Sequence, residues 1–229
     1  MTRKILTSRM LATFALLALP ATLYAHGVSG KDAGFIEQVQ GVAFAPFLYL
    51  GAKHMVTGYD HLLFLAGVIF FLVRLRDVAL YASLFALGHS LTLLSAVMFD
   101  WRADAHLVDA VIGLSVAYKG FENLGGFRAF GWEPDTRLAV LGFGLVHGFG
   151  LATKLQELSL SRDGLFANLV GFNLGVECGQ LVALTLMVIA FGIWRGTTGF
   201  TRHARAANML LLILGFVLAG EQLAGYLTP

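Results

Sequence analysis

The sequence places ionisable side chains inside long apolar runs, where they could do chemistry within a membrane. An ionisable group at the centre of a bilayer costs about 2.5–3.5 kcal/mol on insertion scales, so it usually faces a cavity, a partner or an ion path. Imidazole and carboxylate groups also bind divalent transition metals. The candidate metal ligands are therefore His54, Asp60, His61, His89, His147 and Glu177.

The densest motif is His54-Met-Val-Thr-Gly-Tyr-Asp60-His61. On a continuous helix His54 and His61 share a face but lie about 10.5 Å apart along the axis, which is too far for one small ion. Gly58 can permit a bend that brings them together. Asp60 could then be a direct ligand, or could fix a histidine tautomer from outside the ligand set. A polar cap at the membrane surface is the alternative, but the apolar run after His61 favours a site at the mouth of a span.

His89 and His147 each lie in the middle of an apolar stretch. A single buried histidine can simply form a hydrogen bond between two helices, so neither residue is decisive by itself. Glycines surround His147 at positions 142, 144, 148 and 150, and small residues let helices approach closely. Helix packing explains these glycines, but it does not explain the histidine.

Glu177 is the only charged residue between positions 164 and 194, so it must be neutralised, paired or bound to a metal. Asn173 and Gln180 share its helical face at spacings of four and three residues, and we expect them to support it. A protonated Glu177 hydrogen-bonded to a neighbouring helix is the alternative. Asp109 is a further supporting polar residue, because it lies several residues inside its own span.

These ligands suit Ni, Co, Zn, Fe(II) or Cu(II) better than Cu(I), because thiolate is almost absent. Cys178 is the single cysteine, which excludes an intramolecular disulfide framework and a thiolate metal cluster. The chain has no basic cluster and no glycine-rich phosphate loop, so we expect no nucleic acid as a partner. The expected partners are the lipid bilayer, the metal ion and metalloenzyme maturation proteins.

The elements that must position these residues are long apolar helices. Hydrophobic residues make up 57% of the 229 residues and charged residues 13%, against about 25% charged residues in soluble domains. A spanning helix needs about 20 mostly apolar residues. We predict an all-α polytopic membrane helix bundle with about six spans, at residues 56–74, 78–99, 105–123, 136–155, 166–194 and 206–227. For the shorter apolar segment 42–50 we predict a re-entrant or interfacial helix, or part of a seventh span if the leader is retained.

Residues 1–25 have the features of a signal peptide. Basic residues at positions 3, 4 and 9 precede a short apolar core, and Ala25 occupies a plausible cleavage position. An uncleaved first membrane helix is the alternative. Residues 26–229 then form a single transmembrane domain. Basic residues are more frequent in the predicted inner loops than in the outer ones, which indicates a bacterial inner membrane with the mature N-terminus in the periplasm.

A weak internal repeat suggests two inverted halves of three spans each. Phe-Ala-Leu-Gly at 85–88 resembles Phe-Asn-Leu-Gly at 172–175. His61 and His147 precede the two matched phenylalanines by 24 and 25 residues, so they would be equivalent. Inverted repeats are common in transporters, with the binding site near the membrane midplane.

In combination these motifs resemble the HupE/UreJ family of membrane proteins, from about residue 44 to 225. The resemblance rests on His54 with Asp60-His-Leu-Leu-Phe-Leu, Gly88-His-Ser-Leu-Thr, Phe143-Gly-Leu-Val-His-Gly and Phe172-Asn-Leu-Gly-Val-Glu. The family includes proteins that are linked to hydrogenase and urease gene clusters and regarded as nickel permeases. The resemblance implies about six spans, a signal sequence, and metal uptake with His54, Asp60 and His61 as the capture motif. The nickel-linked members have a second motif in which His, Gly and Glu are closely spaced. Here His147-Gly-Phe-Gly keeps one histidine, and no glutamate follows nearby, which is similar to a divergent branch of the family.

The leading hypothesis is a secondary permease for a divalent transition metal, most readily nickel by resemblance. It would capture the ion at the motif from His54 to His61 on the periplasmic side and pass it to His89, His147 and Glu177 near the midplane. Proton exchange at these groups could couple transport. The alternatives are a non-transporting accessory or assembly factor for a membrane metalloenzyme, and an intramembrane metalloenzyme. The last is disfavoured because the sequence has no His-Glu-x-x-His motif.

Overall fold

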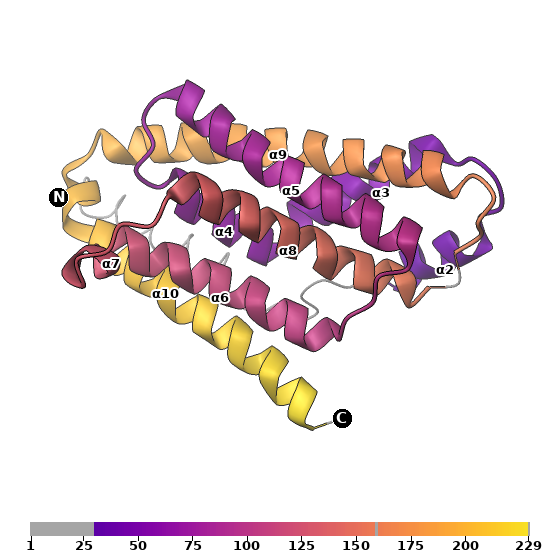
Figure 1. The fold of residues 1–229 in the computed structure, drawn as a ribbon. Coiled ribbons are helices and arrows are strands. Elements are labelled where there is room, and N and C mark those ends of the chain that lie inside the picture. The colour runs from indigo at the N-terminus through magenta and orange to yellow at the C-terminus, as the bar shows by residue number, and fades with distance from the viewer. Residues whose placement is uncertain (1–29, 159, 229) are drawn as a thin grey trace.

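The computed structural model describes residues 30–158 and 160–228, and every regular element in these ranges is a helix (Figure 1). The elements are α2 (Gly30–Gln38), α3 (Phe44–Thr57), α4 (Tyr59–Ile69), α5 (Leu75–Phe99), α6 (Ala105–Asn123), α7 (Gly126–Ala129), α8 (Thr136–Gln156), α9 (Leu165–Arg195) and α10 (Thr198–Leu227). The prediction of an all-α helical bundle is confirmed. The predicted signal peptide lies outside the described residues.

Four of these helices, α5, α8, α9 and α10, are long and apolar enough to cross a membrane. Helix α6 has 19 residues but carries Asp109, Lys119 and Glu122. The predicted boundaries of five spans lie within a few residues of these helices, except that α10 begins eight residues before the predicted start at 206. Arg202 and Arg205 lie in this extension, because a helix can continue past its apolar section with charged side chains in the polar surroundings.

The segment predicted as a separate re-entrant or interfacial helix is instead the first half of an interrupted helix. Helix α3 runs beside α9 in the same direction, because Phe44 lies against Gly171 and Ala52 lies against Gly179. The apolar stretch of 42–50 ends before Lys53 and His54, but α3 itself continues to Thr57. The predicted span 56–74 therefore straddles the break, and its helical part is α4.

Helix α4 continues along α9 in the direction that α3 began. Arg195 at the end of α9 donates hydrogen bonds to the carbonyl oxygens of Ile69 and Phe70, at 2.6 and 2.7 Å, where α4 ends. The carbonyl oxygen of Ile69 also accepts from the N–H of Leu72 at 3.0 Å, so the guanidinium group adds to the hydrogen bonds at this helix end. Together α3 and α4 follow α9 over most of its length, with their break in the interior of the bundle.

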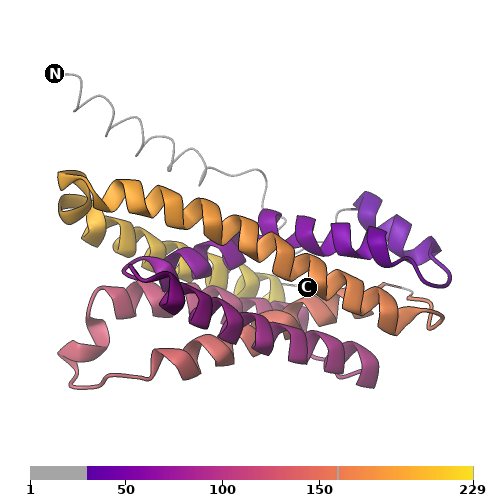
Figure 2. The ribbon, with the colours of Figure 1, turned by 90° about the horizontal axis from the view of Figure 1, so that it is seen from above.

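Three close helix pairs form the bundle: α3 with α9, α5 with α8, and α6 with α10 (Figures 1 and 2). Glycine makes each approach possible. A Cβ atom on Gly175 of α9 would lie 1.9 Å from the carbonyl oxygen of Leu48, and one on Gly148 of α8 would lie 2.1 Å from that of His89. Gly215 of α10 faces the backbone of α6 in the same way. Backbone contact of this kind is typical of helices packed in membranes.

The packing supports the predicted inverted repeat but changes the pairing of its histidines. Gly51 of α3 lies against the carbonyl group of Phe172, and Gly144 of α8 lies against that of Phe85. These are the two phenylalanines matched in the sequence. Because Gly51 and Gly144 occupy matching positions, His54 and His147, each three residues later, are equivalent. The expected equivalence of His61 with His147 is wrong, since the spacing to phenylalanine includes loops of different length.

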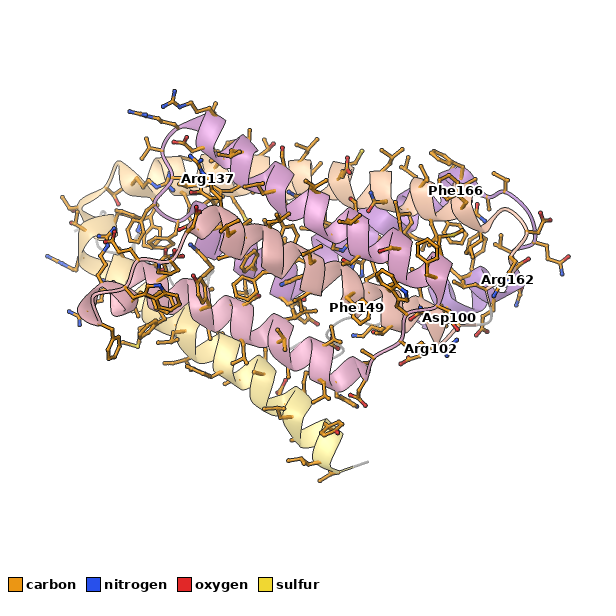
Figure 3. The ribbon with its side chains drawn as sticks, in the orientation of Figure 1. Asp100, Arg102, Arg137, Phe149, Arg162 and Phe166 are labelled. Atoms are coloured by element: carbon orange, nitrogen blue, oxygen red, sulfur yellow. The ribbon has the colours of Figure 1, made fainter. Side chains whose placement is uncertain are left out.

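The two ends of the bundle carry the loops expected on opposite sides of a membrane. Arg137, from a predicted inner loop, lies at one end, and Arg102 and Arg162, from predicted outer loops, lie at the other (Figure 3). The predicted alternation of loops between two sides is therefore present in the fold.

We expect Gly175→Ala to destabilise the protein by at least about 1–3 kcal/mol, because the new methyl group would collide with the backbone of α3. Gly142→Ala on α8 is the matched control, since nothing lies within 4 Å of its Cβ position. The control should retain or gain up to about 1 kcal/mol from the better helix propensity of alanine. Thermal unfolding of the purified protein in detergent measures both changes, and equal effects would contradict the packing of α3 on α9.

Candidate metal centre

The centre is built around the break between α3 and α4. Gly58 has φ −76° and ψ 102°, outside the helical region, and glycine is among the weakest helix formers. Its N–H donates to the carbonyl oxygen of His54 at 2.9 Å and closes α3, while its own carbonyl accepts from Leu62 at 3.1 Å and opens α4. The rings of His54 and His61 therefore lie 5.3 Å apart, so the expected bend is present.

Four imidazole rings from four helices meet at this break. The ring of His61 on α4 lies 5.3 Å from that of His54 on α3, 5.7 Å from that of His89 on α5 and 4.8 Å from that of His147 on α8. His61, His89 and His147 are fully buried, and His54 is half-buried. The structure thus brings together four of the candidate ligands in one cluster.

Asp60 adds a carboxylate to this cluster and is 1% exposed. Its Oδ1 lies 3.2 Å from Nδ1 of His61, and its Oδ2 lies 3.9 Å from Nδ1 of His147. Ligand atoms of Asp60, His61 and His147 all lie within 4.8 Å of one another. Since metal bonds to nitrogen and oxygen are about 2.0–2.2 Å long, the three groups would need to contract by less than about 1 Å to share one ion.

The interrupted helix and the apolar walls set the electrostatics of the cluster. Asp60 lies in the first turn of α4, where the helix dipole favours an anion, and His54 lies in the last turn of α3, where it favours a cation. Phe64 and Phe85 pack on His147 at ring distances of 5.3 and 5.1 Å, and Phe172 lies 6.0 Å from His54. These walls lower the local dielectric, so charge interactions inside the cluster are stronger than in water.

Glu177, the strongest single candidate from the sequence, lies outside the group formed by Asp60, His61 and His147. It is half-buried on α9. The expected shared face is present, because Asn173 donates to Ser90 and Gln180 donates to the carbonyl oxygen of Ala82, both on α5. The glycine face of the same helix contacts α3 instead. Sequence spacing identified the face of α9 correctly, but it could not say which helix that face would meet.

Asp109 also lies outside the cluster, in a buried ion pair. Its Oδ2 accepts from Lys154 Nζ at 2.7 Å, and the two side chains are 4% and 12% exposed. Sequence reasoning counted Lys154 only as a positive charge of the outer side. The spacing of Lys154, seven residues after His147 on one helix, was the available signal that it shares the inward face of α8.

Ser115 is a further residue that sequence reasoning missed. It lies on α6, is fully buried, and its Oγ is 3.0 Å from Nε2 of His147. A serine in an apolar helix is common, so no local signal distinguished it.

The structure does not separate the expected capture motif from the histidines that were expected deeper in the membrane. The capture motif was expected at the periplasmic mouth, with His89 and His147 deeper in the membrane. Instead, the rings of His61, His89 and His147 lie side by side in the interior, because the break at Gly58 falls within the bundle. The described structure therefore has one compact group where the sequence suggested two.

The helical bundle and its buried histidine and aspartate side chains define a polytopic membrane protein with a group that could hold a divalent metal ion. The chain belongs to the HupE/UreJ family, since the family model described as HupE / UreJ protein matches residues 30–229. The family is associated with nickel or cobalt transport or with accessory functions. The resemblance inferred from the motifs is thus confirmed. Neither the curated proteins nor the solved structures give a significant match.

We expect Lys154→Met to destabilise the protein by about 3–5 kcal/mol, because it leaves the carboxylate of Asp109 buried without its cation. The double variant Asp109→Asn/Lys154→Met should lose clearly less than the sum of the single losses. Unfolding in detergent measures the coupling.

The exposed pair of Arg102 and Asp100, 66% and 58% exposed, is the matched control. The corresponding variants Arg102→Met and Asp100→Asn should each change stability by less than about 1 kcal/mol. Additive effects at Asp109 and Lys154 would show that their contact contributes nothing to folding.

Proposed function

We propose that the protein is a secondary permease that carries a divalent transition-metal ion across a bacterial inner membrane. Nickel is the foremost substrate because of the family, while Co, Zn, Fe(II) and Cu(II) share the same ligand preference. The proposed ligands are His54, Asp60, His61, His89 and His147. Direction is proposed as inward, and the mature N-terminus, after removal of residues 1–25, as periplasmic.

The observation that carries this proposal is the convergence of five ionisable side chains, from three separate regions of the sequence, at an interruption of a helix inside the bundle. Interrupted helices form the ion and substrate sites of many secondary transporters, because helix ends and unwound backbone provide polar groups away from water. Burying one carboxylate and several imidazoles without a use for them would be costly.

The three closest ligand groups could close around one ion, because their ligand atoms lie within 4.8 Å of one another. A transport site must bind well enough to admit an ion and weakly enough to release it.

Glu177 is proposed to act in proton coupling rather than as a first ligand of the ion. It is half-buried on α9, at helical spacing from Asn173 and Gln180, whose side chains bond to α5. Carboxylates in membrane helices are frequent members of proton relays in transporters.

We expect Asp60→Asn to lower the affinity of the purified protein for Ni²⁺ by more than about 100-fold, beyond the range typical for loss of an outer partner. The change replaces the carboxylate of the cluster with an amide group of nearly the same size. Asp77→Asn, at a partly exposed acid whose side chain is 39% exposed and pairs with Arg76 in the first turn of α5, is the matched control and should bind normally. Titration calorimetry in detergent measures affinity, and ⁶³Ni²⁺ uptake into proteoliposomes measures transport.

Three outcomes are informative. Binding and uptake that are both lost in Asp60→Asn but kept in Asp77→Asn would support the permease. Tight binding without any uptake by the wild type would reject transport and leave a metal-binding accessory protein. Equal binding by both variants would reject the cluster as the metal site.

A further inference from the structure

Ser115 connects α6 to the metal cluster through His147. Its hydroxyl oxygen lies 2.6 Å from the carbonyl oxygen of Ile112, one turn earlier in the same helix, and 3.0 Å from Nε2 of His147 on α8. Ser115 and His147 are both fully buried. Water therefore does not compete for these two contacts.

The number of hydrogen atoms available to the Ser115 hydroxyl group decides which partner is the donor in each of its two hydrogen bonds. The carbonyl oxygen of Ile112 can only accept, so the single hydroxyl hydrogen of Ser115 must lie in the 2.6 Å contact with it. The hydroxyl oxygen then has only lone pairs left for His147. Consequently, the 3.0 Å contact needs a hydrogen on Nε2 of His147, which donates to Ser115.

The other nitrogen of this ring faces the candidate ligands. Nδ1 of His147 lies on the edge of the ring towards Asp60, whose Oδ2 is 3.9 Å away. In a neutral imidazole with hydrogen on Nε2, Nδ1 carries the lone pair that a metal needs. The ring thus contacts α6 through Nε2 and faces the cluster through Nδ1.

We propose that Ser115 is a positioning residue that fixes His147 as the Nε2–H tautomer and so makes Nδ1 its metal ligand. This inference rests on the proposed metal site, but the tautomer itself can be tested without any metal. Outer partners that fix a histidine ligand in this way commonly contribute 10- to 100-fold to metal affinity. Alanine at position 115 would keep the packing of α6 but would remove the acceptor.

The first experiment uses the wild-type protein without metal, labelled with ¹⁵N-histidine, and reads the tautomer of His147 from its ring nitrogen shifts. The His147→Gln variant identifies the signal by difference. We expect the hydrogen on Nε2. A ring with its hydrogen on Nδ1 would overturn the proposal, whatever the protein transports.

The second experiment compares Ni²⁺ affinity in three variants. Ser115→Ala should lose about 10- to 100-fold and show mixed tautomers, while Ser115→Thr, which keeps a hydroxyl, should recover most of the affinity. Ser95→Ala is the matched control, because the Ser95 hydroxyl bonds only to a carbonyl oxygen of its own helix, that of Leu91. Its affinity should not change.

The two proposals fail in different ways. If the wild type binds Ni²⁺ without transporting it, the permease is rejected and the role of Ser115 stands. If Ser115→Ala keeps both the Nε2–H tautomer and full affinity, the role of Ser115 is rejected and the permease stands.

Discussion

The cost of holding charge away from water is the constraint on which the rest of this structure depends. A buried carboxylate, three fully buried imidazoles and one half-buried imidazole lie in an apolar helical bundle, and their ring or atom contacts join them in one cluster. The break at Gly58 lowers that cost, because the start of α4 favours the carboxylate of Asp60 and the end of α3 favours a cation. A separate buried ion pair, Asp109 with Lys154, meets the same constraint by direct pairing.

Close backbone contact between helices gives this cluster its geometry. Gly148 lies against the carbonyl oxygen of His89, so the histidines of α5 and α8 are adjacent in both helix register and space. Gly51 and Gly144 set the registers of α3 and α8 against their neighbours three residues before His54 and His147. The ligand positions are therefore fixed by helix contacts that involve no ligand side chain, which is the support that a precise site requires.

Sequence patterns predicted the parts of the structure that depend on one segment at a time. Apolar runs gave the helices of the bundle, and Gly58 gave the bend that unites His54 with His61. Patterns did not predict the relative rotation of the helices, which decides that Glu177 lies outside the group of Asp60, His61 and His147 and that Ser115 contacts His147. Such contacts join residues 32 positions apart, and the periodicity of one helix contains no information about its partner.

The glycine contacts also bear on how such a sequence can change over generations. Any replacement at Gly51, Gly148 or Gly175 adds at least a Cβ atom, and at each position that atom would overlap backbone of another helix. Every amino-acid change reachable from a glycine codon by a single base adds such an atom. These positions therefore have almost no neutral neighbours in the genetic code. The glycine contacts of this bundle should consequently change slowly over generations.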